Sequence, residues 1–170
     1  LDNIPFIQQT QEPELFFSKD STNLYLYIKK KNINRLEGFL GFASREDNSK
    51  LRVDGNLDLA LTNNFNYGES INLLYKSNGD EQQTFNLNTH LPYIFKTPLS
   101  LSAQLNIFRQ DSIFSNTTQG FGISYNITPQ TLLKLDYTFE NSTTPTPLAF
   151  TEEFTKNRID LGFQYNRRTT

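Results

Sequence analysis

The chain has 170 residues, a formal net charge of -2 at pH 7 and a mean hydropathy of -0.56. This near-neutral balance excludes the basic footprint of a nucleic-acid-binding protein and the charge run of an acidic tail. Cysteine is absent and there is one histidine, which excludes a disulfide framework, a thiolate metal site and a histidine cluster, so we expect no metal and no cofactor.

The apolar runs are all far shorter than the roughly 20 residues of a membrane helix. A helical membrane protein is therefore excluded. A membrane β-strand needs only about 9 to 11 residues and hides half of its side chains in the lumen, so a barrel is compatible with this hydropathy. The chain begins at Leu1 and contains no methionine, so we expect a processed chain or a fragment.

The N-terminal stretch predicts a small soluble module of short strands. Strand-forming residues occupy 5–10, 15–18 and 23–31, and the polar run 19–22 predicts a turn between the last two. A basic cluster at 29–31 closes this stretch. We place the boundary near residues 32–34, so that the module spans 1–33 and a second region spans 34–170.

The second region begins with a weak alternating segment at 35–44, followed by a strong one at 51–62. In the strong segment, apolar residues at odd positions alternate with polar residues at even ones. Successive side chains of a strand point to opposite faces, so this period of two predicts a strand with one apolar and one polar face.

Six further segments repeat the alternation. They occupy 70–76, 84–93, 99–107, 121–127, 133–140 and 158–166. Turn residues at 77–80 and 128–130 predict tight connections. Longer connections are expected at 45–50, 63–69, 95–98, 109–118 and 142–156. Helical periodicity is almost absent, so the sequence predicts an all-β chain with about eight antiparallel strands in its second region.

The polar face of these strands favours a membrane barrel over a soluble sandwich. Asparagine is depleted in ordinary strands, yet it recurs here at positions 56, 72, 86, 88, 106, 126 and 166. A hydrated lumen tolerates it because polar side chains can bond there to each other and to water. Aromatic residues near strand ends fit interfacial girdles, at positions 75, 93, 125, 137, 139 and 165. A soluble β-domain remains the alternative.

Several blocks in this region resemble one family. They are Asp54-Gly55-Asn56-Leu57-Asp58-Leu59-Ala60-Leu61-Thr62-Asn63-Asn64-Phe65, Gly68-Glu69, Gln82-Gln83-Thr84-Phe85, Leu91-Pro92-Tyr93-Ile94-Phe95, Thr97-Pro98-Leu99 and Arg109-Gln110-Asp111. Together they resemble the early barrel of BamA-type outer-membrane protein assembly factors. The stretch 5–31 resembles the closing strands of the last POTRA module, which precedes the barrel in that family.

The resemblance implies a transmembrane β-barrel of which about half is visible, because the family's barrel has sixteen strands and its Val-Arg-Gly loop motif does not occur here. An eight-stranded sheet can also close on its own. The end of the sequence, 166–170, lacks the terminal aromatic residue common in outer-membrane barrels, which favours an interrupted larger barrel.

Catalytic groups are not apparent, so we expect no enzyme. Asp54 and Asp58 share one face but lie about 13 Å apart along a strand, too far for a carboxylate pair to act alone. His90 falls on a polar face, where hydrogen bonding is the expected role. The residues predicted to face the lumen are Arg52, Asp54, Asn56, Asp58 and His90.

The resemblance implies a function carried by a strand edge. In the family, the first barrel strand pairs weakly with the last, and a client strand adds to the opened seam. Here that strand includes Leu36, Gly38, Leu40, Gly41 and Phe42. The implied partners are client outer-membrane proteins, the lipid bilayer and periplasmic or outer-membrane accessory subunits, with no nucleic acid.

The implied location is the outer membrane of a Gram-negative bacterium, with the N-terminal module in the periplasm. Two alternatives stay open. One is a related outer-membrane transporter that moves a polypeptide through its lumen. The other is a small passive barrel or a soluble β-domain with a binding role.

Overall fold

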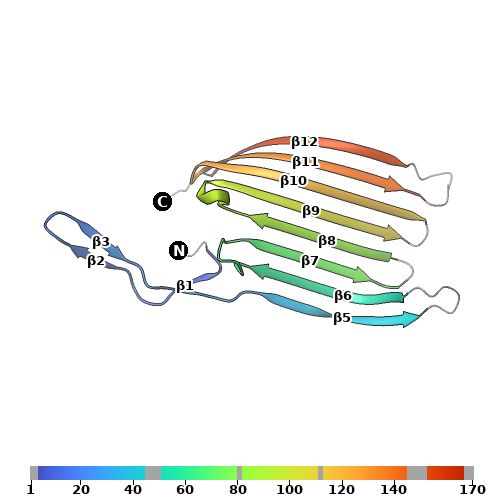
Figure 1. The fold of residues 1–170 in the computed structure, drawn as a ribbon, viewed down its shortest axis with the longest axis horizontal. Helices are drawn as coiled ribbons and strands as arrows, with labels where there is room; N and C mark the ends of the chain where they lie inside the picture. The colour runs from blue at the N-terminus through green and yellow to red at the C-terminus, as the bar shows by residue number, and fades with distance from the viewer. Residues whose placement is uncertain (1–3, 45–50, 80–81, 111–112, 145–152, 167–170) are drawn as a thin grey trace. The chain divides into compact units, whose positions relative to one another are not determined.

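A computed structural model describes residues 4–44, 51–79, 82–110, 113–144 and 153–166 (Figure 1). The chain divides into two compact units, residues 1–34 and residues 35–170. Strands dominate both units, and the described helical structure is the short 3₁₀ turn η1, Ile94–Lys96. In the described part of the chain, no helix has the length and apolar character required to cross a membrane.

The first unit is a long hairpin interrupted midway. Its strands are β1 (Ile7–Gln9), β2 (Glu14–Phe17), β3 (Thr22–Tyr25) and β4 (Ile28–Lys30). β2 pairs with β3 and β1 pairs with β4, both antiparallel. The single strand predicted over 23–31 is therefore wrong: it is two strands that belong to two different pairs. Pro13 has no N–H to donate, and it lies where the ladder breaks between β1 and β2.

The second unit is one antiparallel meander of eight strands. The strands are β5 (Arg35–Ser44), β6 (Leu51–Thr62), β7 (Ser70–Ser77), β8 (Gln82–Leu91), β9 (Leu99–Gln110), β10 (Phe114–Thr128), β11 (Thr131–Thr143) and β12 (Phe154–Tyr165). Each strand pairs with the next, so spatial order follows sequence order. The all-β class and the eight antiparallel strands predicted from the alternation are confirmed.

The sheet is open among the described residues. β5 and β12 lie at its two edges, and each pairs with one neighbour in the described ladder (Figure 1). An open edge presents a row of backbone donors and acceptors. The two edges are therefore where the unit can add further strands.

The strands are longer than the alternation predicted. The connection expected at 109–118 is wrong over most of its length, because β9 continues to Gln110 and β10 begins at Phe114. Over 115–119 of β10 both faces are polar, so the alternation of apolar and polar residues cannot be seen there. Pairing holds this segment in the sheet: Thr117, for example, lies opposite Ile107 on one side and Asn141 on the other. Likewise β11 extends to Thr143 and β12 begins at Phe154, while 145–152 of the loop expected there lies outside the described residues.

The register gives the sheet one apolar and one polar face. Along one row, leucines are direct neighbours on five consecutive strands: Leu36, Leu59, Leu73, Leu87 and Leu105. The opposite face carries two asparagine rows: Asn86 lies beside Asn106 in one, and Asn72 lies beside Asn88 in the other. We call these the apolar face and the polar face.

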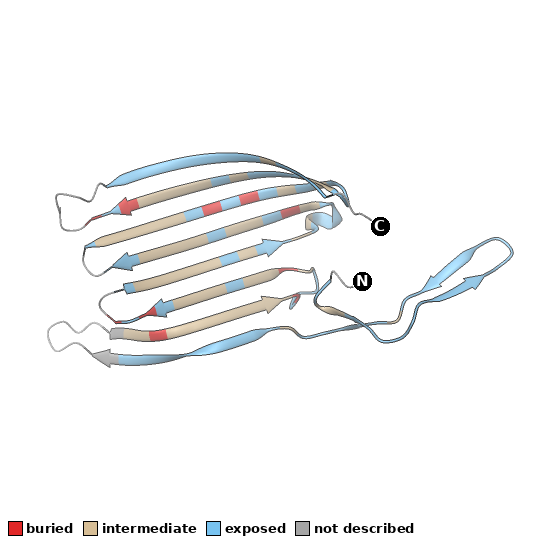
Figure 2. Ribbon diagram, turned by 180° about the vertical axis from the view of Figure 1, so that it is seen from behind, coloured by how far each residue is buried: buried red, intermediate tan, exposed pale blue. Residues whose placement is uncertain are grey.

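The second unit lacks an ordinary hydrophobic core. Among the described residues no hydrophobic side chain is buried, and Leu161 and Ile159 are 81% and 72% exposed. Figure 2 shows the buried positions as isolated segments on strands that are otherwise intermediate or exposed. A single-layer sheet buries side chains only against lateral neighbours, so its apolar face needs an external partner.

Candidate functional site

The first candidate site is the free edge of β5. The strand pairs with β6 along its whole length, from Arg35 opposite Ala60 to Ser44 opposite Leu51. Its other side meets no strand in the described residues. Its outward backbone N–H and C=O groups are therefore available to a further strand.

The predicted edge residues are divided between the two faces. Leu36, Leu40 and Phe42 lie on the apolar face, where they are 69%, 41% and 65% exposed. Gly38 shares that face, whereas Gly41 lies on the polar face opposite Asp54.

The sequence reasoning missed Phe39. Its ring is 73% exposed on the polar face of the same strand, opposite Asn56. A large aromatic residue in the polar phase of the alternation was the signal that could have identified it. β5 thus offers apolar side chains on both of its faces.

Glycine is required at two positions where β5 meets β6. Gly38 has a φ of 149° and Gly55 a φ of 122°, a region that other residues rarely occupy. A Cβ on Gly38 would overlap the carbonyl oxygen of Asn56, and one on Gly55 would overlap the carbonyl oxygen of Phe39. The two backbones therefore approach each other too closely for any side chain at these positions.

Gly41 has no such requirement, because a Cβ there would lie 3.9 Å from the nearest atom, the carbonyl oxygen of Asp54.

The only ion pair between β5 and β6 among the described residues joins Arg35 and Asp58. Arg35 Nη2 lies 3.0 Å from Asp58 Oδ1 and 3.1 Å from Asp58 Oδ2. Both side chains are solvent-accessible, so the pair adds little stability.

Four of the predicted lumen residues lie on the polar face: Asp54, Asn56, Asp58 and His90. Asp54 and Asn56 line a hollow of about 670 Å³ together with Phe39 of β5 and Lys76 of β7. Asp58 is in the ion pair with Arg35, and His90 lies in a separate row between Ser70 and Ser102. Arg52 belongs to β6, but its side chain lies outside the described residues.

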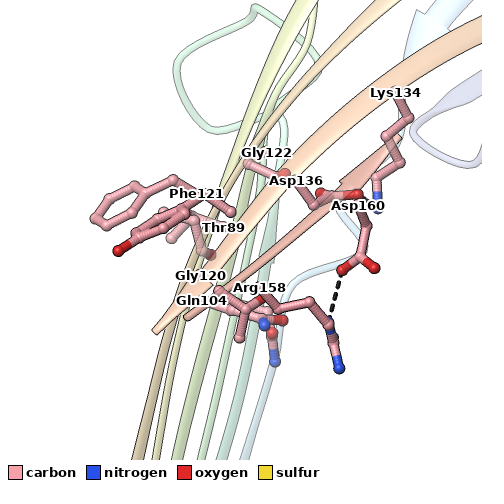
Figure 3. Close-up of a pocket in the computed structure, with 14 residues that line it drawn as sticks. Thr89, Gln104, Gly120, Phe121, Gly122, Lys134, Asp136, Arg158 and Asp160 are labelled. Atoms are coloured by element: carbon pink, nitrogen blue, oxygen red, sulfur yellow. Dashed lines mark hydrogen bonds and ion pairs between the residues drawn. The ribbon is translucent and has the colours of Figure 1, made fainter. Parts of the chain in front are cut away.

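A second hollow of about 370 Å³ lies on the polar face toward β12 (Figure 3). Lys134 Nζ lies 2.9 Å from Asp136 Oδ2, and Arg158 Nε lies 2.7 Å from Asp160 Oδ2. The two aspartates are direct cross-strand partners, an arrangement that would be repulsive without the two cations.

Gly122 gives this second hollow its depth. A Cβ there would overlap Asp136 Oδ1 and Ser102 Oγ, so the absent side chain is what leaves room for the carboxylate. At Gly120 a Cβ would lie 2.6 Å from Gln104 Cγ. The surface is polar, carries both signs of charge and can hold an extended polar segment by hydrogen bonds.

The buried carboxylate of the sheet is structural. Glu69 is 2% exposed and lies in the connection between β6 and β7, where Oε1 accepts a hydrogen bond of 2.7 Å from Phe65 N and Oε2 one of 3.1 Å from Tyr67 N. Burial opposes ionisation, but the backbone donors together outweigh it, so the pKa of Glu69 lies below its ordinary value. Glu69 thus holds the turn as a fixed anion.

Metal ligands do not cluster in the described ranges, where no group of three or more His, Cys, Asp or Glu side chains could hold an ion. The carboxylates that do gather, Asp136 and Asp160, each bind a cationic side chain. The arrangement is suited to binding through backbone edges and polar side chains.

No protein-family model matches this chain, and no curated protein matches it. A solved structure similar to it is BamA from Haemophilus ducreyi lacking POTRA domains 1-3, with a TM-score of 0.47 and 16% sequence identity. The match covers 94% of this chain and 35% of that one.

Proposed function

We propose that residues 35–170 form part of the wall of an outer-membrane β-barrel that assembles and inserts client barrel proteins by pairing their strands at β5. The observation that carries the membrane part of this proposal is the apolar face, whose leucine and aromatic side chains the described residues leave uncovered. Burial of apolar surface is worth roughly 25 cal/mol per Å², so a face of this extent strongly favours contact with hydrocarbon over water.

The polar face supports the same orientation. Its asparagine rows, ion pairs and hollows would be costly against lipid and are well placed in a hydrated lumen. Backbone groups inside the sheet are paired strand to strand, as a membrane requires. Only at the two open edges do backbone donors and acceptors lack a partner strand among the described residues.

The client-pairing role rests on the edge of β5. A client strand that adds there would satisfy the free backbone groups without any bond chemistry and without a cofactor. Gly38 and Gly55 contribute no side-chain packing between β5 and β6. Phe39 offers a contact for a client side chain on the polar side.

The first unit fits the end of a POTRA-like periplasmic module. This assignment is supported by two short antiparallel strand pairs, which precede β5 in sequence and belong to a separate compact unit. This assignment places the chain in the envelope of a Gram-negative bacterium, with accessory subunits as further partners.

The membrane part is tested by refolding the full chain in detergent and in phospholipid vesicles. We expect folding only in their presence, with electrophoretic migration that changes on heating. A chain that folds and stays soluble in water without detergent would overturn the proposal and favour a soluble binding domain.

The pairing part is tested by disulfide crosslinking, because the chain has no cysteine of its own. Leu36→Cys on β5 and Ile159→Cys on β12 place thiols at the two edges, with similar exposure. A client carrying one cysteine in its terminal strand should crosslink to the first and not to the second. Equal crosslinking, or crosslinking at β12 alone, would contradict client pairing at β5.

A polypeptide transporter is the second candidate, favoured by the polar hollow beside Arg158 and Asp160. An unfolded polypeptide in transit should crosslink to Thr138→Cys, which lines that hollow. Crosslinks there without any at Leu36→Cys would favour transport over insertion.

A further inference from the structure

The turn after β7 contains the only Asn-Gly pair of the chain, Asn78-Gly79. The structure describes both residues, which directly follow Ser77 at the end of β7. An asparagine can lose its side-chain amide without an enzyme when the backbone nitrogen of the next residue attacks the side-chain carbon Cγ. Glycine has no Cβ, so its nitrogen is the least hindered for this attack.

The hydrogen bonds of this turn favour the attack. Asn78 Oδ1 accepts a hydrogen bond of 2.8 Å from Gln82 N, which withdraws electron density from Cγ. Gly79 N donates to Ser77 Oγ at 3.3 Å, longer than the roughly 2.9 Å typical of such a bond. Asn78 Nδ2 has no hydrogen bond to the described residues. The electrophilic carbon is therefore polarised, and the attacking and leaving nitrogens are weakly held.

The reacting residues are also accessible and lie outside the strand ladder. Asn78 is exposed, so water and hydroxide reach it. Ser77 is the last residue of β7 that is paired with both neighbouring strands. Gly79 has a φ of 91°, a turn conformation that glycine adopts readily. Its peptide group is therefore not fixed between two strands.

Other pairs of residues that could react in this way lie inside the sheet. Asp54-Gly55 is the only Asp-Gly pair of the chain, and Gly55 is paired with β5 and with β7. Asn141-Ser142 lies in β11, where both residues are paired with β10 and with β12. A backbone nitrogen held in the plane of the sheet cannot easily turn toward the preceding side chain. The structure thus distinguishes Asn78 from these positions.

The reaction needs water and no other reactant. Gly79 N gives up its proton to hydroxide and attacks Asn78 Cγ, so that a C–N bond forms. The bond from Cγ to Nδ2 then breaks, and ammonia leaves with a proton taken from water. Water opens the resulting cyclic imide at either of its carbonyl groups. One product is aspartate, and the other is isoaspartate, in which the backbone runs through the side-chain carbon.

We propose that Asn78 deamidates spontaneously in the folded chain and that this modification changes the charge of the hollow beside β5. Asn78 lines the hollow of about 670 Å³ together with Phe39, Asp54 and Lys76. Asp54 and Lys76 are the charged side chains among its described lining residues, so their charges balance. A new carboxylate at position 78 gives the hollow a net negative charge and favours cationic over anionic partners there.

Peptide mapping by mass spectrometry tests the modification. The refolded full chain is incubated at neutral and at mildly alkaline pH and is sampled over time. We expect the peptide with Asn78 to gain the mass of one deamidation, faster at the higher pH because Gly79 N must lose its proton. Isoaspartate should be among the products. No isoaspartate should form at Asp54, and Asn141 should stay intact.

The urea-unfolded chain is the reference for the folded one. If Asn78 stays intact in the folded chain over the time in which it deamidates in urea, the proposal is wrong. Deamidation of Asn141 as fast as that of Asn78 in the folded chain would also overturn it, because the turn would then have no special reactivity.

The change in charge is tested with Thr84→Cys, which places the only thiol of the chain in the hollow. Its rates of reaction with a cationic and with an anionic methanethiosulfonate are compared before and after incubation. We expect the ratio of the cationic to the anionic rate to rise severalfold. Asn78→Gln in the same chain is the matched control, because glutamine keeps the amide but forms the larger ring far more slowly.

Asn78→Asp should show the raised ratio without incubation, because it carries the new carboxylate from the start. The ratio should stay constant in the chain with Asn78→Gln. If Asn78→Asp leaves the ratio unchanged, the proposed effect on the hollow is wrong. If the ratio rises equally in the chain with Asn78→Gln, the change in charge does not come from Asn78.

Discussion

The two edges of the sheet occupy equivalent positions but are built differently. β12 is tied to β11 by side chains, with Tyr137 Oη 2.7 Å from Asn157 Oδ1 and Thr155 Oγ1 3.1 Å from Asn141 Oδ1. β5 approaches β6 through Gly38 and Gly55, at backbone conformations that only glycine adopts readily.

The difference lies in how each edge strand is held by its one neighbour in the described sheet. Hydrogen bonds between side chains of β11 and β12 add to the backbone hydrogen bonds that pair these two strands. On β5 the glycines add no packing, and the tie to β6 is an exposed ion pair. Under the proposed function, β5 is the edge at which a client strand pairs.

The largest expected effect comes from Gly55→Ala or Gly38→Ala. Each places a Cβ onto a backbone carbonyl oxygen and forces a left-handed φ on alanine, so we expect a loss of about 2 to 4 kcal/mol in the free energy of unfolding. Denaturant titration of the refolded chain measures it.

The matched controls are Gly162→Ala on β12 and Gly41→Ala on β5. A Cβ at these sites meets its nearest atom at 3.5 Å and 3.9 Å, so both variants should stay within about 0.5 kcal/mol of the parent. Equal losses in all four variants would remove the distinction between the two edges.

Glu69→Gln should weaken the β6 side of the sheet by about 2 kcal/mol, because hydrogen bonds to a buried charge are replaced by neutral ones. The folded-state pKa of Glu69 is lowered, so its contribution is complete above the ordinary value of 4.5 and is lost as pH falls through the lowered pKa. Denaturation at a series of acidic pH values should show this loss in the parent and not in Glu69→Gln.

If the free energy of unfolding of the parent did not change with pH below 4.5, this role for Glu69 would be contradicted. Glu37→Gln is the control, since the Glu37 side chain is 70% exposed on β5. It should leave the profile of the parent unchanged.

Tyr137→Phe tests the tie at β12. Removal of the hydroxyl deletes its hydrogen bond to Asn157 and should cost about 1 kcal/mol, with faster amide exchange along β12. Tyr125→Phe is the control on the same face, because its hydroxyl has no hydrogen bond within the described residues. If the two variants lose equal stability, the side-chain tie does not contribute.

The smallest effect is expected for Arg35→Gln, which removes the exposed ion pair with Asp58. The change should be smaller than that of Tyr137→Phe and should vanish at high salt, because screening already weakens the pair in the parent. A large loss that persists in salt would show β5 to be tied as firmly as β12.

The alternation predicted the eight-stranded fold well where one face was apolar, as in β6 from Leu51 to Thr62. It failed where both faces were polar, as over 115–119 in β10, because the hydrophobic pattern carries no information there. It also missed Phe39, an aromatic residue in the polar phase of β5, whose position opposite Asn56 only the register gives.

The sequence by itself determined the class and the two faces, because a strand's period of two assigns each side chain to a side whatever the partner strand. It also marked Gly38 and Gly41 alike as edge glycines. Only the tertiary structure separated them, because the need for glycine depends on how closely another backbone approaches: Asn56 O blocks a Cβ at Gly38, while Gly41 has room. The same dependence on partners decided that Glu69 is a buried clamp and that Phe95 is left exposed.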